Sequence, residues 1–485
     1  MQRRMDKELK KSYLLIFGCV YAGVVLVSIV LQFLLLPKIL PHLHGGDGML
    51  SGSDSVEFHR KAVLYADKLE KKGWSSWRLD TGPKMSQQPV TIAGAIYFAT
   101  GIREPWAVIP FNAFFHAATS ILLMNIYMRF VSKAKIALLA LGPFVLFPSA
   151  MAWYAQIHRD GIYIFGIVLF VLSLILMLEK SCRKRDFILS GLTCFTGAMI
   201  AWSMRQYSLL LVIGIACPAF LFLLIYRFAY ALKLKRGLFE STGKIFLNLF
   251  IIIALFPLTD AGHFSGWASN VKMENMKNVK VIEDKAILPK SEKPLIPGKE
   301  FSPQKDDKLA DSPEVEKDPN AWQKSGFLPS KLDSVIKYAS VRRDMFYEIH
   351  PVADSYLDRN VHFRSALDVF FYTPRAIQVG WLAPFPSMWF SSGKNLASEK
   401  QRLISGAEMA IAYLCLVGLI YSFYCFRKNS AFWLVFYFCI SMTYIFTITI
   451  PNIGSLYRMR YGCFTIVLGF GILGAAKFFK RFVRK

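Results

Sequence analysis

The 25-residue run Tyr13–Pro37, YLLIFGCVYAGVVLVSIVLQFLLLP, decides the fold class of this chain. It carries no charge, and it is long enough to cross a hydrocarbon core of about 30 Å, which takes about 20 helical residues. Five Lys/Arg residues among the first eleven precede it. Because the run keeps bulky residues to its end and has no small-residue cleavage site, we interpret it as a retained membrane anchor.

Similar apolar runs recur along the 485 residues, of which 54% are hydrophobic and 15% aromatic. This composition is typical of a polytopic membrane protein. We therefore predict an all-α polytopic membrane protein with about ten transmembrane helices, surface helices in the first external loop and a long external insertion. The ten predicted spans are residues 13–37, 105–128, 136–157, 161–178, 187–203, 207–226, 245–259, 403–426, 431–451 and 461–476.

The formal net charge of +25 follows the positive-inside rule. The segments that this topology makes cytoplasmic hold 24 Lys/Arg and 5 Asp/Glu, a net of +19, and the rest of the chain holds 34 and 28, a net of +6. Topology thus accounts for most of the positive charge, and we predict no nucleic-acid partner. Both termini are predicted to be cytoplasmic.

The eight cysteines form no CxxC pair, and none lies in the long polar loops. The sequence therefore indicates neither a disulfide framework nor a cysteine metal site.

The topology divides the chain into three parts. Residues 1–260 form the first half of the membrane domain, including the first external loop, 38–104. Residues 261–375 form an external, periplasmic-side loop, and residues 376–485 form an interfacial segment, 376–392, followed by the last three transmembrane helices.

Helical patterns are also predicted inside the external loops. Ser55–Lys72 has the apolar spacing of a surface helix, with Ser53 or Asp54 as its N-cap. Residues 89–101 are apolar but too short to cross, so we predict a re-entrant or interfacial helix. In the long loop, residues 272–324 have the composition of a mobile excursion, and the flanks 335–347 and 361–372 are predicted to form helices packed on the membrane domain.

Ionisable residues gather on the predicted outer face. Near the ends of spans such groups are costly unless they are paired or face a wet cavity, so they are candidates for a site. The first loop supplies Asp54, Glu57 and His59; the outer end of the third span supplies His158, Arg159 and Asp160; the outer end of the fifth supplies Arg205; and the connection between the ninth and tenth supplies Asn452, Arg458 and Arg460.

Several interpretations of these residues remain open. Each arginine can be a snorkelling anchor at a helix end, or the four can together hold a phosphate or pyrophosphate, which guanidiniums bind bidentately. His158 can be a hydrogen-bonded structural histidine, and Asp160 can simply neutralise Arg159 or Arg205. An enzyme that joins a sugar from a lipid-phosphate donor to a hydroxyl needs a carboxylate base and cations for the departing phosphate, and this set supplies both.

Three stretches resemble, in order and spacing, the GT-C superfamily of polytopic glycosyltransferases, particularly its bacterial protein and lipid-A sugar transferases. They are SDSVEFHRKA (53–62), PVTIAGAIYFATG (89–101) and IPFNA (109–113). Arg159-Asp160 at the start of a span and NIGSLYRMR (452–460) are similar to patterns in envelope-polysaccharide glycosyltransferases.

The resemblance implies Asp54 as the catalytic carboxylate, with Glu57 as its substitute. It implies that Arg159, Arg205, Arg458 and Arg460 bind the donor phosphate, with His59, His158, Asp160 and Asn452 in support. Glu57 or His59 would assist or bind a metal; the cofactor is left unknown, and a divalent cation stays open. The implied partners are a polyprenyl-phosphate-linked sugar donor, a glycan or lipid acceptor and membrane lipids, in the bacterial cytoplasmic (inner) membrane.

Two other functions remain as alternatives. An O-antigen-type polysaccharide polymerase shares the topology, the long loop and the arginines, but it does not require the first-loop acid. A lipid-linked oligosaccharide flippase or another transporter predicts polar residues along a path through the middle of the membrane, and the predicted spans contain few.

Overall fold

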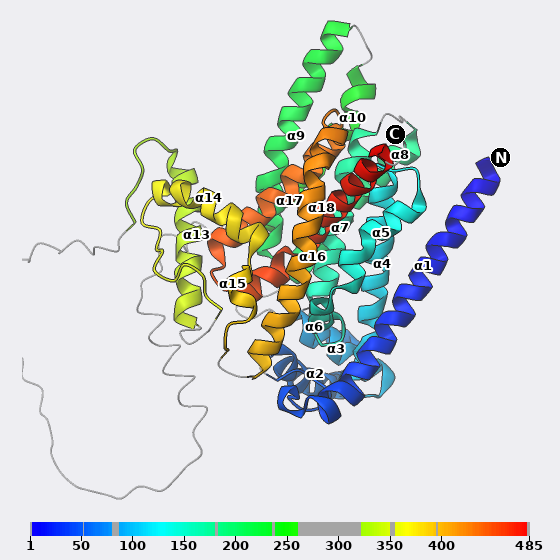
Figure 1. Cartoon of the computed structure of the whole chain (residues 1–485), viewed down its shortest axis with the longest axis vertical. Helices are drawn as coiled ribbons and strands as arrows, with labels where there is room; N and C mark the ends of the chain where they lie inside the picture. The colour runs from blue at the N-terminus through cyan, green and yellow to red at the C-terminus, as the bar shows by residue number, and fades with distance from the viewer. Residues whose placement is uncertain are drawn as a thin grey trace, which may run out of the picture.

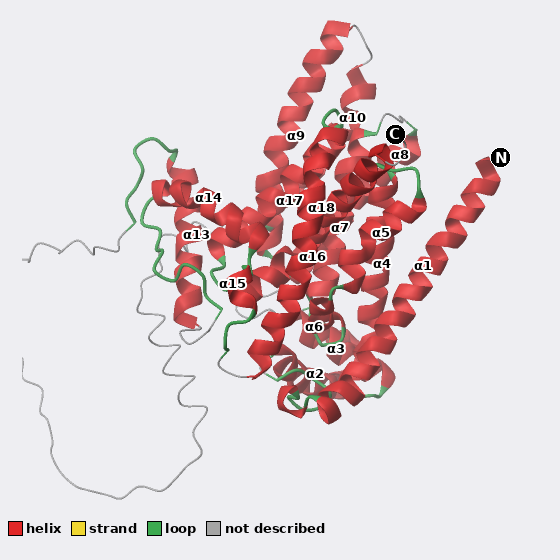
Figure 2. Cartoon of the chain, viewed as in Figure 1, coloured by secondary structure: helices red, strands yellow, loops and turns green. Residues whose placement is uncertain are grey.

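The computed structural model of this chain describes residues 2–51, 53–79, 87–179, 183–234, 238–259, 322–349, 355–393 and 396–482. Over these ranges the protein is helical and contains no strand, as Figure 2 shows. Residues 261–321 of the predicted external insertion, with most of the predicted mobile stretch 272–324, lie outside the described residues.

Eight helical segments of the described residues are long and apolar enough to cross a membrane, so the chain is a multi-pass α-helical membrane protein. They lie in α1 (Gln2–Val30, continued by a π-helix to Ile39), α4 (Ile109–Met128), α7 (Asp160–Leu178), α8 (Lys184–Met204), α9 (Tyr207–Leu234), α16 (Leu396–Phe426), α17 (Ser430–Thr449) and α18 (Ile453–Phe482). The predicted membrane class is confirmed.

The remaining two predicted spans have a different form. The segment predicted at 136–157 consists of α5 (Ala134–Leu146) and a following piece, Pro148–Tyr154, that ends in α6 (Met151–Tyr154), with a bend of 53° between them. This pair would be a ninth, broken crossing. The segment predicted at 245–259 belongs to α10 (Leu238–Ala254), whose apolar stretch is too short to count as a span. The count of ten stays a prediction.

Helix α7 occupies the middle of the bundle, and α1 lies at its edge (Figure 1). In the most apolar window of α7, 83% of residues are buried, against 17% for α1. A helix that is apolar on every side is expected to pack among other helices. Glycines allow α7 and α8 to approach closely, because a Cβ added to Gly197 would lie 2.6 Å from the backbone nitrogen of Phe170.

Two surface helices close one end of the bundle. They are α2 (Asp54–Lys72) and α3 (Gln88–Thr100), which pack together through a small core that includes Ala62, Ala66 and Tyr97. Both helices were predicted, α2 from its apolar spacing and α3 from an apolar run too short to cross. Ser53 is the N-cap of α2, with its hydroxyl accepting from the Ser55 amide. Figure 1 shows both termini at the opposite end of the bundle.

The flanks of the long polar segment also contain helices, as predicted. Both α13 (Ser330–Ile349) and α14 (Ala366–Leu382) lie against α17 beside the bundle (Figure 1). The helix predicted over 361–372 begins later than expected. Residues 361–364 are not helical, because the Ser365–Asp368 capping box starts α14 at Ala366. In the segment 376–392, which is predicted to be interfacial, Trp381 is buried against Phe464. The short helix α15 (Pro386–Trp389) follows.

The prediction that 452–460 connects two spans holds only for Asn452, because α18 begins at Ile453. The Asn452 side-chain oxygen accepts a hydrogen bond from the Ser455 amide at 3.0 Å, and α18 begins directly after it. Arg458 and Arg460 therefore lie within the first turns of this helix. Successive residues of an α-helix turn by about 100°, so two residues two positions apart differ by about 200°. The two arginines therefore point to nearly opposite sides of α18.

Candidate functional site

The candidate site is centred on Asp160, the first residue of α7. Its side chain is only 2% exposed, although a buried carboxylate is costly unless it is paired. The start of a helix stabilises a negative charge through the helix dipole. The position of Asp160 at the start of α7 therefore favours its charged form.

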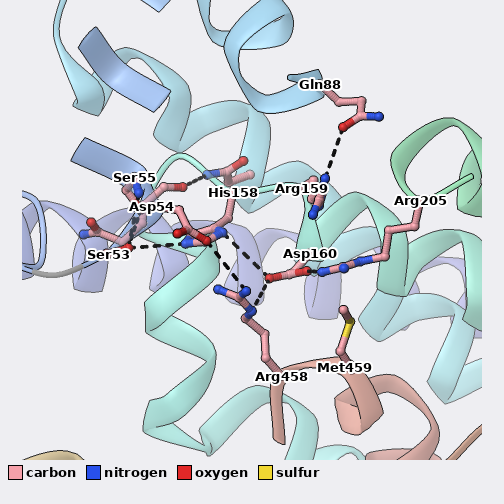
Figure 3. Close-up of polar contacts among 12 residues, drawn as sticks. Ser53, Asp54, Ser55, Gln88, His158, Arg159, Asp160, Arg205, Arg458 and Met459 are labelled. Carbon is pink, nitrogen blue, oxygen red and sulfur yellow. Dashed lines mark hydrogen bonds and ion pairs between the residues drawn. The ribbon is translucent and has the colours of Figure 1, made fainter. Parts of the chain in front are cut away.

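Two arginines from distant parts of the chain complete the pairing of Asp160. Arg205, which directly follows α8, donates to Oδ1 through its NH2 group and is itself 2% exposed. Arg458, from α18, places its Nε 3.2 Å from Oδ2 and keeps 29% of its side chain exposed. The carboxylate therefore contacts two guanidiniums (Figure 3), of which Arg205 is buried and Arg458 is partly exposed.

Asp54 reaches the same cluster from the first turn of α2. Its Oδ2 lies 3.8 Å from the NH2 group of Arg458, and 62% of the Asp54 side chain is exposed. The N-cap of Ser53 fixes the start of this helix and so the position of Asp54. Arg458 thus links the exposed acid of the first loop to the buried acid of α7.

His158 connects α2 to the start of α7. Its Nε2 is 3.4 Å from the Ser53 hydroxyl oxygen, and its Nδ1 is 3.8 Å from Oδ2 of Asp160. Burial, only partly offset by the charge of Asp160, lowers the pKa of His158 to about 4. The imidazole is therefore neutral at pH 7 and acts as a hydrogen-bonded link between the two elements.

Arg159 lies between His158 and Asp160 in the sequence, and its side chain contacts the first residue of α3. Its NH1 donates to Oε1 of Gln88 at 3.3 Å (Figure 3). Burial, together with the nearby charge of Arg205, lowers the pKa of Arg159 to about 10. Burial is the larger cause, and the smaller one, repulsion from Arg205, would be opposed by an anion bound beside Arg159.

The cluster as a whole carries more cations than acids. Three arginines, Arg159, Arg205 and Arg458, surround two carboxylates, and His158 is neutral at pH 7. Asp54 is exposed, and Arg458 and Arg159 are partly exposed. Chemically, this arrangement offers a solvent-accessible base next to a guanidinium that can bind an anion.

Two predicted residues of α2 lie outside the cluster. Glu57 pairs on the surface of its own helix with Arg60 at 2.5 Å and Lys61 at 3.0 Å. The hydrogen bond from Lys61 lowers the pKa of Glu57. His59 lies 2.9 Å from the Tyr97 hydroxyl through Nδ1, and burial lowers its pKa. His59 therefore helps to attach α2 to α3.

Asn452 and Arg460 also have other roles in the structure. Asn452 caps α18 and donates to the Ser355 hydroxyl at 2.9 Å. Arg460 is fully buried and donates to the carbonyl oxygens of Gly380 and Ala383 at the end of α14, with the Phe464 ring 4.4 Å from its guanidinium carbon. Arg460 therefore ties α14 to α18 and lies outside the candidate site.

Sequence reasoning missed three residues that support the cluster. Gln88 binds Arg159, the Tyr207 hydroxyl accepts from Arg205 at 3.0 Å, and the Tyr163 ring lies 5.2 Å from the Arg205 guanidinium carbon. Gln88 had a usable signal, because Pro89 marks the first turn of a helix and so identifies its neighbour as a helix start. The two tyrosines lie among many aromatic residues of the spans, and nothing local distinguishes them.

The described residues contain no group of three or more His, Cys, Asp or Glu side chains arranged to hold a metal ion. Comparison with known proteins gives no match to this chain among protein-family models, curated proteins or solved structures.

Proposed function

We propose that this chain is a membrane glycosyltransferase that moves a sugar from a polyprenyl-phosphate donor to an envelope glycan or lipid acceptor on the outer side of the cytoplasmic membrane. The observation that carries the proposal is the exposed carboxylate of Asp54 beside Arg458, whose guanidinium is anchored from behind by the buried Asp160. A base and an anion-binding cation lie side by side at a bundle end.

Asp54 is the proposed base. It takes the proton of the acceptor hydroxyl, whose oxygen then forms a bond to the anomeric carbon of the donor sugar. The bond between that carbon and the phosphate oxygen breaks, and the lipid phosphate leaves with the electron pair. The reaction needs no further reactant, because the proton goes to Asp54 and the negative charge goes to the phosphate.

Arg458 and Arg159 are the proposed ligands of the donor phosphate, and Arg205 holds Asp160 in position. An ion pair between groups as exposed as Asp54 and Arg458, 3.8 Å apart, is weak. Charge-assisted hydrogen bonds from a guanidinium to phosphate are stronger than this ion pair. We therefore expect the donor phosphate to replace Asp54 as the partner of Arg458. Binding of the donor would then leave the Asp54 carboxylate free to act as base.

The test is transfer of a sugar from a polyprenyl-phosphate donor by the purified protein in detergent. Replacing a general base typically costs a factor of about 100 to 10,000, so Asp54→Asn should lower the rate at least about 100-fold with unchanged expression and elution. The matched control is Asp67→Asn, on the same helix but paired with Arg103. Near-normal transfer by Asp54→Asn would refute the assignment.

The same assay separates the alternatives. A polymerase without a required first-loop acid would keep its activity in Asp54→Asn. Transport needs a sealed bilayer, so turnover in detergent micelles would exclude a flippase as the sole activity. Absence of turnover with every polyprenyl-phosphate sugar, combined with transport in vesicles, would overturn the proposal.

A further inference from the structure

A second polar region lies at the end of the bundle opposite α2 and α3. It is a cavity of about 630 Å³, lined by residues at the ends of α4, α7, α9, α16, α17 and α18. The C-terminal end of α18 is at this end in Figure 1, far from the candidate site. The proposed transferase mechanism uses none of the residues that line it.

The cavity lies where several membrane spans end. Arg129 directly follows the span that ends at Met128, and Glu179 follows the span that ends at Leu178. Lys428 lies in the short connection between the spans of α16 and α17. Residues at the ends of spans lie at the depth of the lipid headgroups. The cavity is therefore at the level of the membrane interface.

Positive charge dominates the cavity wall. Four basic side chains line it (Arg129, Arg227, Lys428 and Lys477), against a single acid, Glu179. Arg129 forms an ion pair with Glu179, so this acid is already engaged. The Lys477 ammonium is 4.0 Å from the centre of the Phe426 ring, which holds it at the wall. The residues described around the cavity thus favour an anion.

Apart from the uncharged polar residues Asn429 and Ser430, the rest of the wall is mainly apolar. Ile175 and Leu178 of α7 and the rings of Phe130 and Phe426 line the cavity beside the basic residues. A free inorganic ion gains nothing from such surface, whereas a lipid presents a charged headgroup with a glycerol and acyl chains attached. Basic pockets between transmembrane helices at a membrane surface are suited to anionic lipid headgroups.

We propose that this cavity binds the phosphate headgroup of an anionic phospholipid. Lys428 and Lys477 contact the phosphate, and the apolar residues contact the adjoining glycerol region. Such a lipid joins α16, α17 and α18, the last three helices of the bundle, to α4, α7 and α9. The site is distinct from the proposed donor site, which lies at the other end of α7 and α18, the two helices that contribute to both.

The test compares binding of phosphatidylglycerol and phosphatidylcholine to the full-length protein in a neutral detergent, by native mass spectrometry over a concentration series. Phosphatidylglycerol should bind more tightly. Each basic residue near an anionic lipid contributes about 1 kcal/mol of binding free energy. The double variant Lys428→Gln, Lys477→Gln should therefore weaken this binding about 30-fold, or about 2 kcal/mol. The charge-preserving pair Lys428→Arg, Lys477→Arg should restore it.

The control is the double variant Arg427→Gln, Lys480→Gln. It removes two positive charges from the same two parts of the chain, but neither residue lines the cavity. Its binding of phosphatidylglycerol should stay within about threefold of the parent, because exposed charges act only through a screened field. Melting temperatures of all variants report whether they fold.

Three results would overturn the proposal. The first is equal affinity for the two lipids, and the second is an equal loss in both double variants. The third is inorganic phosphate binding as tightly as phosphatidylglycerol, because this would assign the cavity to a free anion. Selective loss in folded Lys428→Gln, Lys477→Gln protein, with recovery in the arginine pair, would support it.

Discussion

Replacing Asp160 by Asn tests whether this residue is the electrostatic centre of the site. The variant keeps the volume of the side chain but removes the negative charge between Arg205 and Arg458. Removing one partner of a buried pair typically costs about 3–5 kcal/mol, because it leaves an uncompensated charge. Arg205 is 2% exposed and carries most of this cost, whereas Arg458 is 29% exposed and can turn toward water.

The Tyr207 hydroxyl and the Tyr163 ring remain beside Arg205 and moderate the loss. We therefore expect about 3 kcal/mol, a large share of the roughly 5–15 kcal/mol that stabilises a typical protein. The unfolding entropy is about 2 cal/mol/K per residue, so over 485 residues this loss corresponds to a fall of about 3 °C in a thermal melt of the purified protein in detergent. The control Asp67→Asn breaks the exposed pair with Arg103 and should cost less than about 1 kcal/mol.

A double-mutant cycle identifies the cause of the loss. If the cost arises from the unpaired cation, adding Arg205→Gln to Asp160→Asn should recover about 1–3 kcal/mol relative to the sum of the single changes. Equal melting temperatures for Asp160→Asn and Asp67→Asn would refute the reasoning. So would simple additivity in the cycle, since it would mean that the two side chains do not interact.

Three further predictions concern other parts of the chain. The folded pKa of His158 is about 4, below its unfolded value of about 6.5, so the unfolded chain binds the proton more readily as the pH falls. Thermal melts should therefore show a loss of stability on the order of 2 kcal/mol from pH 7 to pH 5. His158→Gln should remove this part of the pH dependence. Arg458→Lys should raise the KM for the lipid-phosphate donor about tenfold, because lysine cannot bind phosphate bidentately. Arg460→Lys should lower the melting temperature and leave that KM unchanged. The opposite pattern would exchange the roles of the two arginines. Gly197→Ala should cost about 1–3 kcal/mol in thermal stability by forcing α7 and α8 apart, while Gly214→Ala, whose added Cβ meets nothing within 4 Å, should cost none; equal melts would contradict the close approach.

The membrane helices could be predicted because their signal is local. A run of about 20 apolar residues is enough to define a span, and the prediction for 105–128 agrees with the structure to the residue. At 136–157 the apolar run was recognised, but its bend of 53° was not, because a count of apolar residues carries no information about a change in helix direction. A proline disfavours helix in the residue before it, and the break between Phe147 and Pro148 follows that rule.

The candidate site could be predicted only in part. Position at the end of a span identified Asp160, Arg205 and Arg458 separately, but which of them meet depends on how each helix is rotated about its axis. Arg458 and Arg460 illustrate the limit, since two neighbours in one motif face opposite sides of α18. Such rotation is set by packing across the whole bundle, and a single stretch of sequence does not contain it.

The pairing of Asp160 with Arg458 has a consequence for how the protein is made. Helix α7 enters the membrane early in synthesis, and α18 is the last of the described helices to follow. Until α18 is in place, Asp160 has Arg205 beside it but lacks the second guanidinium, and Asp54 lacks its neighbouring cation. In a partly synthesised chain the cluster is therefore incomplete, and the contacts of Arg458 with Asp54 and Asp160 form only after the last described helix has packed into the bundle.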